Sequence, residues 1–154
     1  MVVDTVRSRA GPLAVLALVL VVTSGCVGPT LTAHGYRDRV VYTAGQLSSA
    51  IATTDLAGRL QLDHKAILAL TNVVVSQAES DADDATTALF TRQPPTSDSL
   101  ALYERVRQPF QDAVDALRAV RIAVRREDRE ALRAGLAGLA GPAQQVSEIQ
   151  QAAG

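Results

Sequence analysis

The side chain best suited to covalent chemistry in this sequence is its single cysteine, Cys26. One cysteine in 154 residues excludes a disulfide within the chain and a cysteine-rich zinc site. Cys26 directly follows Thr23, Ser24 and Gly25, which follow an apolar run over residues 11–22. Free cysteines are often buried in cores, but a position between an apolar run and a Gly- and Pro-containing segment does not suit a core. We therefore expect the thiol of Cys26 to be modified outside the folded domain.

Residues 1–25 have the three-part layout of a secretory signal peptide. Arg7 and Arg9 form a short basic region, an apolar run follows, and small residues precede the cleavage site. The apolar run is shorter than the ~20 residues that a membrane-spanning helix needs. An uncleaved membrane anchor remains the alternative, because the stretch 10–36 contains no Asp, Glu, Lys or Arg.

The sequence Thr23-Ser24-Gly25-Cys26 resembles the lipobox of bacterial lipoproteins. The resemblance implies that the Cys26 thiol receives a diacylglyceryl group through a thioether. It also implies that signal peptidase II recognises Thr23, Ser24 and Gly25 and cuts before Cys26. Thr23 stands where that family most often has Leu. One acyl chain binds a membrane only reversibly, whereas the two or three chains (palmitate, for example) on such a cysteine imply a stable anchor on the outer face of the cell membrane.

The charge balance excludes two classes of function. Fifteen basic and 16 acidic residues give a net charge of −1, which argues against a strongly basic nucleic-acid binder and against an acidic disordered tail. The length fits one ordinary domain. The sequence leaves the oligomeric state open.

Beyond the cysteine, the hydrophobic pattern predicts an all-α domain over residues 36–154. Residues 26–35 contain Gly and Pro without periodicity, so we predict a flexible tether that spans roughly 30 Å at most. Apolar residues then recur every three or four positions. The segments with this pattern are 36–58, 63–90, 98–126 and 128–154. Their short connections favour antiparallel neighbours, so we predict an antiparallel up-down four-helix bundle.

The core stripes of the first two segments can be read from this spacing. The first stripe is Tyr36, Val40, Ala44, Leu47, Ile51 and Thr54. The second stripe is Ile67, Thr71, Val74, Ala78, Ala85 and Leu89.

Glycine and proline predict where these helices end or bend. Gly58 is expected to end the first helix. The Pro94-Pro95 pair is the strongest break in the chain, and Pro109 predicts a kink inside the third helix. Gly141-Pro142 weakens the fourth segment, which leaves either one helix or two short helices hinged there.

An acidic cluster precedes the Pro94-Pro95 break. Its members are Glu79, Asp81, Asp83 and Asp84. A hairpin folded at the prolines predicts that this cluster faces Arg105 and Arg107, where surface ion pairs of ~0–1 kcal/mol each would favour the correct register. A solvated helix face and cation binding are the alternatives.

A basic cluster surrounds the junction between the third and fourth segments. Its members are Arg118, Arg121, Arg125, Arg126, Arg129 and Arg133. In an up-down bundle tethered at Cys26, this junction lies at the end away from the membrane, which disfavours a polybasic membrane patch. The cluster is therefore a candidate contact for an envelope protein or an anionic wall polymer, with a solvated turn as the alternative.

Motifs for catalysis, cofactors and metals are lacking in the sequence. His34 falls in the predicted tether, and His64 follows Asp63, but neighbouring residues on a helix point apart and cannot share a metal. The sequence contains no G-x-S-x-G motif and no phosphate-binding glycine loop. We therefore expect no metal, no cofactor and no enzymatic activity.

From Tyr36 onward, the chain resembles small all-helical lipoproteins of high-GC Gram-positive bacteria. The resemblance rests on the lipobox, the tether, the Gln-Pro-Pro break and the Val-Arg-Arg-Glu-Asp sequence, and it implies no particular activity. We expect a membrane-tethered interaction or structural module of the cell envelope. The alternative is a ligand-binding accessory lipoprotein with a small pocket near Pro109 or Gly141-Pro142.

The core provides a criterion that separates these two functions. An enclosed apolar cavity among Phe110, Tyr103 and Val74 would favour ligand binding. A filled core with an exposed apolar strip would favour a protein partner.

Overall fold

The computed structural model describes residues 32–153, and within that range the chain forms helices and no strand. The helices are α2 (Ala33–Leu62), α3 (Leu68–Phe90), α4 (Ser97–Arg125), α5 (Arg129–Gly138) and α6 (Ala140–Ala153). The signal peptide predicted at 1–25, the lipid attachment at Cys26 and most of the tether lie outside the described residues.

The first described helix begins earlier than the sequence predicts. The Thr32 side chain accepts a hydrogen bond from the Gly35 backbone N–H at 3.1 Å, which caps α2 and places its first residue at Ala33. Residues 33–35 therefore belong to the bundle and not to the predicted tether.

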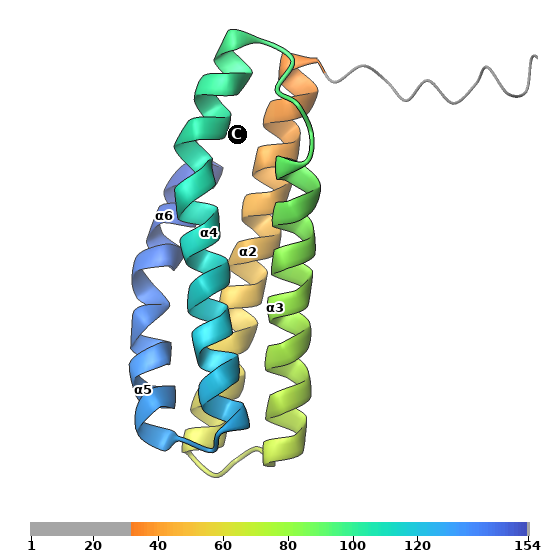
Figure 1. Ribbon diagram of the computed structural model, residues 1–154. Helices are drawn as coiled ribbons and strands as arrows, with labels where there is room; N and C mark the ends of the chain where they lie inside the picture. Colours follow the sequence, from red (N-terminus) through yellow and green to blue (C-terminus); the bar gives the residue numbers. More distant parts are fainter. Residues whose placement is uncertain (1–31, 154) are drawn as a thin grey trace, which may run out of the picture. The chain divides into compact units, whose positions relative to one another are not determined.

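The helices pack side by side into a bundle in which α2 and α4 form the centre (Figure 1). On one side, α3 packs against both central helices. On the other side, α5 and α6 follow one another and pack against the same two helices. Since α3 contacts neither α5 nor α6, a wide arc of its surface has no helix over it.

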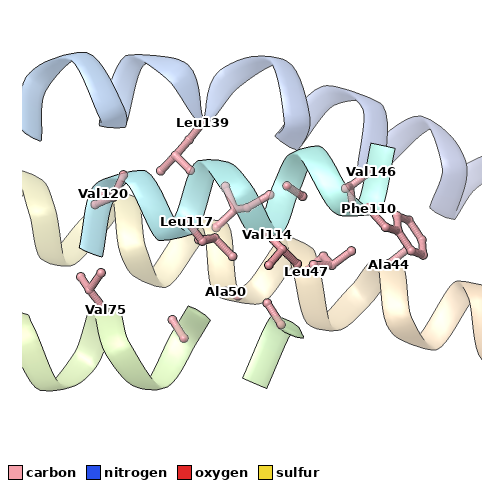
Figure 2. Close-up of a cluster of buried hydrophobic side chains, with 14 of the residues drawn as sticks. Ala44, Leu47, Ala50, Val75, Phe110, Val114, Leu117, Val120, Leu139 and Val146 are labelled. Atoms are coloured by element: carbon pink, nitrogen blue, oxygen red, sulfur yellow. The ribbon is translucent and has the colours of Figure 1, made fainter. Parts of the chain in front are cut away.

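The core is filled by small and medium side chains from all the helices (Figure 2). Val114, Leu117 and Val120 of α4 lie between α2, with Ala44, Leu47 and Ala50, and the last part of the chain, with Leu139 at the α5–α6 junction and Val146 of α6. The largest fully buried side chains are Tyr36 and Phe110.

The stripe predicted for the first helix is correct, and the stripe predicted for the second is partly wrong. All six predicted α2 residues are buried. On α3, the buried face is Thr71, Val75, Ala78, Ala82, Thr86 and Leu89. Val75 is therefore buried in place of Val74, and Ala82 and Thr86 are buried in place of Ala85. Ile67 is exposed because it precedes the helix as its N-cap.

Gly58 does not end α2, which continues to Leu62. A Cβ atom built on Gly58 would lie 2.7 Å from Leu136 Cδ2 of α5. The glycine is therefore needed for a close approach between two helices, and not for a turn.

Helices α2 and α4 end without the glycine that usually follows a helix. His64 and Glu127 occupy the left-handed region of backbone conformation, each with φ of 56°. The residue after each of them donates a 6→1 hydrogen bond back to its helix. These bonds run from Lys65 N–H to Leu60 O, at 2.8 Å, and from Asp128 N–H to Ala123 O, at 3.1 Å. Both ends lie at the same end of the bundle, opposite Ala33 (Figure 1).

The predicted pairing of the acidic cluster with Arg105 and Arg107 is wrong. Glu79 instead bonds Arg118 and Arg121, at least about ten residues, or ~15 Å of helix rise, further along α4. The reason is that residues 91–96 do not make a tight hairpin. They run onward from the end of α3, and α4 begins well beyond it (Figure 1). Six extended residues can cover ~20 Å, which accounts for the shift.

The last predicted segment, 128–154, forms two helices, and the break between them lies just before Pro142. The break falls at Leu139, between α5 and α6, and Pro142 lies in the first turn of α6. Proline suits the first turn of a helix, where backbone N–H groups have no partner within the helix. Because Pro142 has no N–H, the carbonyl of Gly138, four residues earlier, receives no helical hydrogen bond from it. Gly138 is accordingly the last residue of α5.

Candidate interaction surfaces

A charged group centred on Glu79 joins α3 to α4. The Glu79 carboxylate accepts hydrogen bonds from Arg121 Nε at 2.5 Å and Nη2 at 3.3 Å, and from Arg118 Nε at 3.2 Å. The Glu79 side chain is only 14% exposed, so these charge-assisted bonds replace most of its hydration. Arg118 also bonds Asp115 of its own helix at 2.6 Å. Two of the six arginines predicted as a partner-contact tip therefore hold the bundle together.

The other four predicted arginines lie at the end of the bundle opposite Ala33. Arg125, Arg126, Arg129 and Arg133 are exposed there, around the α4–α5 junction. Arg129 Nη2 donates to the Leu62 carbonyl at 2.7 Å, which satisfies one of the last carbonyls of α2. Within residues 32–153, the remaining three form no ion pair. The basic surface is thus smaller than the sequence suggests.

A second surface, missed by the sequence reading, consists of exposed apolar side chains. Ile67, Leu70 and Val73 at the start of α3 are 71%, 55% and 67% exposed, and Leu56 of α2 is 60% exposed. We call these four residues the α3 strip. Single exposed apolar residues are ordinary, but several large ones on one surface are characteristic of interaction sites.

Register places Leu56 beside the other members of the α3 strip. Thr71 of α3 donates a hydrogen bond to Gln61 Oε1 of α2 at 3.0 Å, so these two residues lie side by side. Leu56 comes five residues before Gln61, so it lies level with a residue about five positions after Thr71, a few residues beyond Val73. Leu56 also follows Thr53 by three residues, so both share one face of α2, and Thr53 lines the same groove as Val73. Helix spacing and register therefore place the four apolar residues toward the same side of the α2–α3 pair.

That groove, of about 320 Å³, runs between α2 and α3. Small residues, including Ser49, Ala50 and Ala78, form part of its lining, with Val73 and Val74 beside them. Asp81 is its only charged lining residue. Residues 66–78 contain no Asp, Glu, Lys or Arg at all, so the surface along the first half of α3 is both apolar and uncharged.

The enclosed cavity among Phe110, Tyr103 and Val74 that would favour ligand binding is not seen in the described bundle. Phe110 is fully buried, and the Phe90 ring fills the space beside it, with ring centroids 6.4 Å from Phe110 and 5.4 Å from Tyr103. Val74 faces the α2–α3 groove instead. The hollows near the two predicted pocket positions are open grooves: about 480 Å³ beside Gln108 and Gln111, and about 540 Å³ beside Leu139 and Ala143.

One buried polar group stands out in the core. The Tyr36 hydroxyl is fully buried and has no hydrogen-bond partner among the described residues. Burial, followed by the nearby Tyr103, raises the pKa of Tyr36 above its ordinary value of 10.0. The hydroxyl is therefore a source of instability in the fold.

Histidines and acids within residues 32–153 form no cluster of three or more that could hold a metal ion. His34 Nε2 lies 3.5 Å from Asp38 Oδ2, and His64 is exposed just after the end of α2. Two members of the acidic cluster, Glu79 and Asp83, pair with Arg118 of α4, the latter at 3.8 Å, while Asp81 and Asp84 remain exposed.

Comparisons of the chain with protein families, with curated proteins and with solved structures find no match. Among helices α2 to α6, none is both long and apolar enough to cross a membrane.

Proposed function

We propose that this protein is a lipid-tethered, non-enzymatic interaction module of the cell envelope, and that the α3 strip is its docking surface. The single observation that supports docking is the exposure of four large apolar side chains, three of which lie in the uncharged stretch 66–78. The filled core and the lack of an enclosed cavity in the described bundle favour a protein partner over a small ligand. The anchor is supported by the sequence alone, through the signal layout and the Thr23-Ser24-Gly25-Cys26 motif.

The proposal includes the finer architecture of the bundle. The bundle has four arms that run in alternating directions, as in an up-down four-helix bundle. These arms are α2, α3, α4 and the α5–α6 pair. Helix α4 continues through Pro109, and we propose a bend there, because the proline cannot donate to the Arg105 carbonyl and crowds it. The basic end at Arg125, Arg126 and Arg133 then points away from the anchored end and remains available to an anionic wall polymer.

A ligand-binding role is the second candidate. The open groove of about 540 Å³ beside Leu139 and Ala143 lies next to Pro142, one of the two places where a pocket is predicted. Ligand sites usually bury most of the ligand, and an open groove does this poorly. We therefore rank this role below protein docking.

Membrane fractionation tests the tether. Cys26→Ser, expressed in a high-GC Gram-positive host, should move the protein from the membrane fraction to the soluble fraction. Ser24→Ala keeps a small residue before the cysteine and should leave the protein on the membrane. Retention of Cys26→Ser on the membrane at unchanged mass would refute the lipid anchor and favour an uncleaved one.

A further inference from the structure

We infer that the groove between α3 and α4 binds a neutral glycan chain. This α3–α4 groove has a volume of about 480 Å³ and lies beside Gln108 and Gln111. It is a different surface from the α3 strip, so the inference goes beyond the proposed function and requires neither that strip nor the lipid anchor.

Polar side chains dominate the lining of the α3–α4 groove. Eight of its ten lining residues carry a hydroxyl, amide, carboxylate or guanidinium group. The polar lining residues from α4 are Gln108, Gln111, Asp115 and Arg118. Their spacing of three or four residues keeps them on one face of the helix, and this face rises ~15 Å along the groove. A polar groove of that length suits an extended polar ligand.

The charged lining residues hold one another in place. Arg118 Nη1 donates to Asp115 Oδ1 at 2.6 Å, and Arg118 Nη2 lies 3.8 Å from Asp83 Oδ1. Arg118 Nε also donates to Glu79 at 3.2 Å, which fixes the guanidinium against α3. Both carboxylates of the lining keep lone pairs that can accept from ligand hydroxyls, and binding need not order them because Arg118 already does. Since opposite charges compensate one another here, the groove favours a neutral ligand over an anion.

Three neutral side chains of the lining have unused hydrogen-bonding capacity. Gln111 and Thr87 are exposed, and their side chains form no hydrogen bond within residues 32–153. Thr86 is only 6% exposed, and its hydroxyl has no partner among the described residues. Thr71 and Thr91 of α3 and its C-cap, by contrast, donate to the backbone carbonyl four residues earlier. A buried hydroxyl is costly until water or a ligand satisfies it, and a ligand rich in hydroxyls supplies both donors and acceptors.

The scarcity of apolar lining residues favours a glycan over a peptide. Peptides that bind between helices are held by apolar side chains, and the only apolar lining residues are the half-buried Phe90 and the buried Val114. A sugar ring carries hydroxyls around its edge and C–H groups on its faces, so one ring can pack on Phe90 while its hydroxyls meet the polar lining. A small ligand needs an enclosed site, whereas a chain that continues past an open groove is bound along its length.

Binding of the intact protein to immobilised oligosaccharides tests the inference. The protein is used as its host makes it, in a detergent without a sugar head group, because such a head group would compete for the groove. The probes are neutral oligosaccharides of pentoses and hexoses, with counterparts that carry uronic acids or free amines. We expect retention on neutral probes, with little change when salt is added, because the groove carries little net charge. Retention on charged probes alone, or on no probe at all, would overturn the inference.

A pair of glutamines locates the binding surface. Gln111 and Gln145 are both exposed and lie inside helices, but Gln145 belongs to α6, which does not contact α3. Gln111→Ala should weaken binding of the best-retained neutral oligosaccharide about tenfold, as expected when hydrogen bonds to a ligand are lost. Gln145→Ala should leave binding unchanged. Equal effects of the two substitutions would overturn the assignment to the α3–α4 groove.

Thr86→Val provides a second measurement with two readouts. Valine nearly keeps the shape of threonine and removes the hydroxyl without a partner, so the melting temperature of the free protein should rise by a few degrees. The same substitution should weaken binding of the neutral oligosaccharide several-fold, because the ligand loses a hydrogen-bond partner. A stabilised variant that binds as tightly as the unsubstituted protein would contradict the role of Thr86 in the site.

Discussion

Two glycines of the same helix should respond in opposite directions to the same substitution. Gly45 and Gly58 both lie inside α2. A Cβ on Gly45 would meet only Gln150 Nε2, at 3.8 Å, which is an ordinary contact. A Cβ on Gly58 would lie 2.7 Å from Cδ2 and 3.0 Å from Cδ1 of Leu136, which is itself buried.

The magnitudes follow from two opposing effects. Alanine gains about 1 kcal/mol over glycine inside a helix, so Gly45→Ala should raise the free energy of unfolding by that amount. Overpacking a filled core costs about 1–3 kcal/mol. For Gly58→Ala this cost exceeds the gain, since the Leu136 Cγ, at 3.3 Å, is also too close. We expect a net loss of about 1 kcal/mol, and so a gap of about 2 kcal/mol between the two variants.

Urea denaturation of the two variants measures this gap, and thermal melting should reproduce it as a difference of several degrees. The double variant Gly58→Ala with Leu136→Ala should show favourable coupling, because the shortened side chain leaves room for the new methyl group. If Gly58→Ala stabilises the protein as much as Gly45→Ala, the close approach of α2 and α5 is not as described.

Three further substitutions test other parts of the bundle. Glu79→Gln should lower the free energy of unfolding by about 1–2 kcal/mol, because it removes the charge that two arginines share, whereas Asp84→Asn on the exposed surface should change it little. Glu127→Gly should raise it by about 1 kcal/mol in chemical denaturation, because glycine adopts the positive φ of that helix end without strain. Tyr36→Phe should raise it by about 1 kcal/mol, because a buried hydroxyl without a partner is removed. The pKa of Tyr36 is raised on folding, so stability should hold below the unfolded pKa of ~10 and fall as pH rises through the folded pKa. Unfolding measured across that range should show that Tyr36→Phe reduces the fall.

The spacing of apolar residues predicted the all-helical fold well. On α2, the residues that recur every three or four positions in the sequence are the residues that are buried. From Tyr36 to Thr54, an apolar or small residue recurs at every turn on one face, and Arg37, Asp38, Arg39 and Gln46 all lie off that face. On α3 the same reasoning failed at Val73, Val74 and Val75. Three valines in a row present apolar groups over most of the helix circumference, and the packing of α3 between α2 and α4 selects Val75.

The surfaces were harder to predict than the helices, because they depend on the conformation of one loop. The predicted contact of the acidic cluster with Arg105 assumed a tight turn at Pro94. Residues 91–96 instead continue past the end of α3 before α4 begins (Figure 1), and the resulting shift brings Glu79 to Arg118 and Arg121. The α3 strip could have been predicted from the sequence. The start of α3 has more large apolar residues than one buried helix face can hold, so some of them, such as Ile67, Leu70 and Val73, have to be exposed.

The most direct test of the anchored module is the intact mass of the unsubstituted protein extracted from membranes of a high-GC Gram-positive host. The account predicts the mass of residues 26–154 plus a diacylglyceryl group and any further acyl chain, with fragmentation placing the addition on Cys26. A mass equal to the whole 154-residue chain, or to residues 26–154 without lipid, would contradict it.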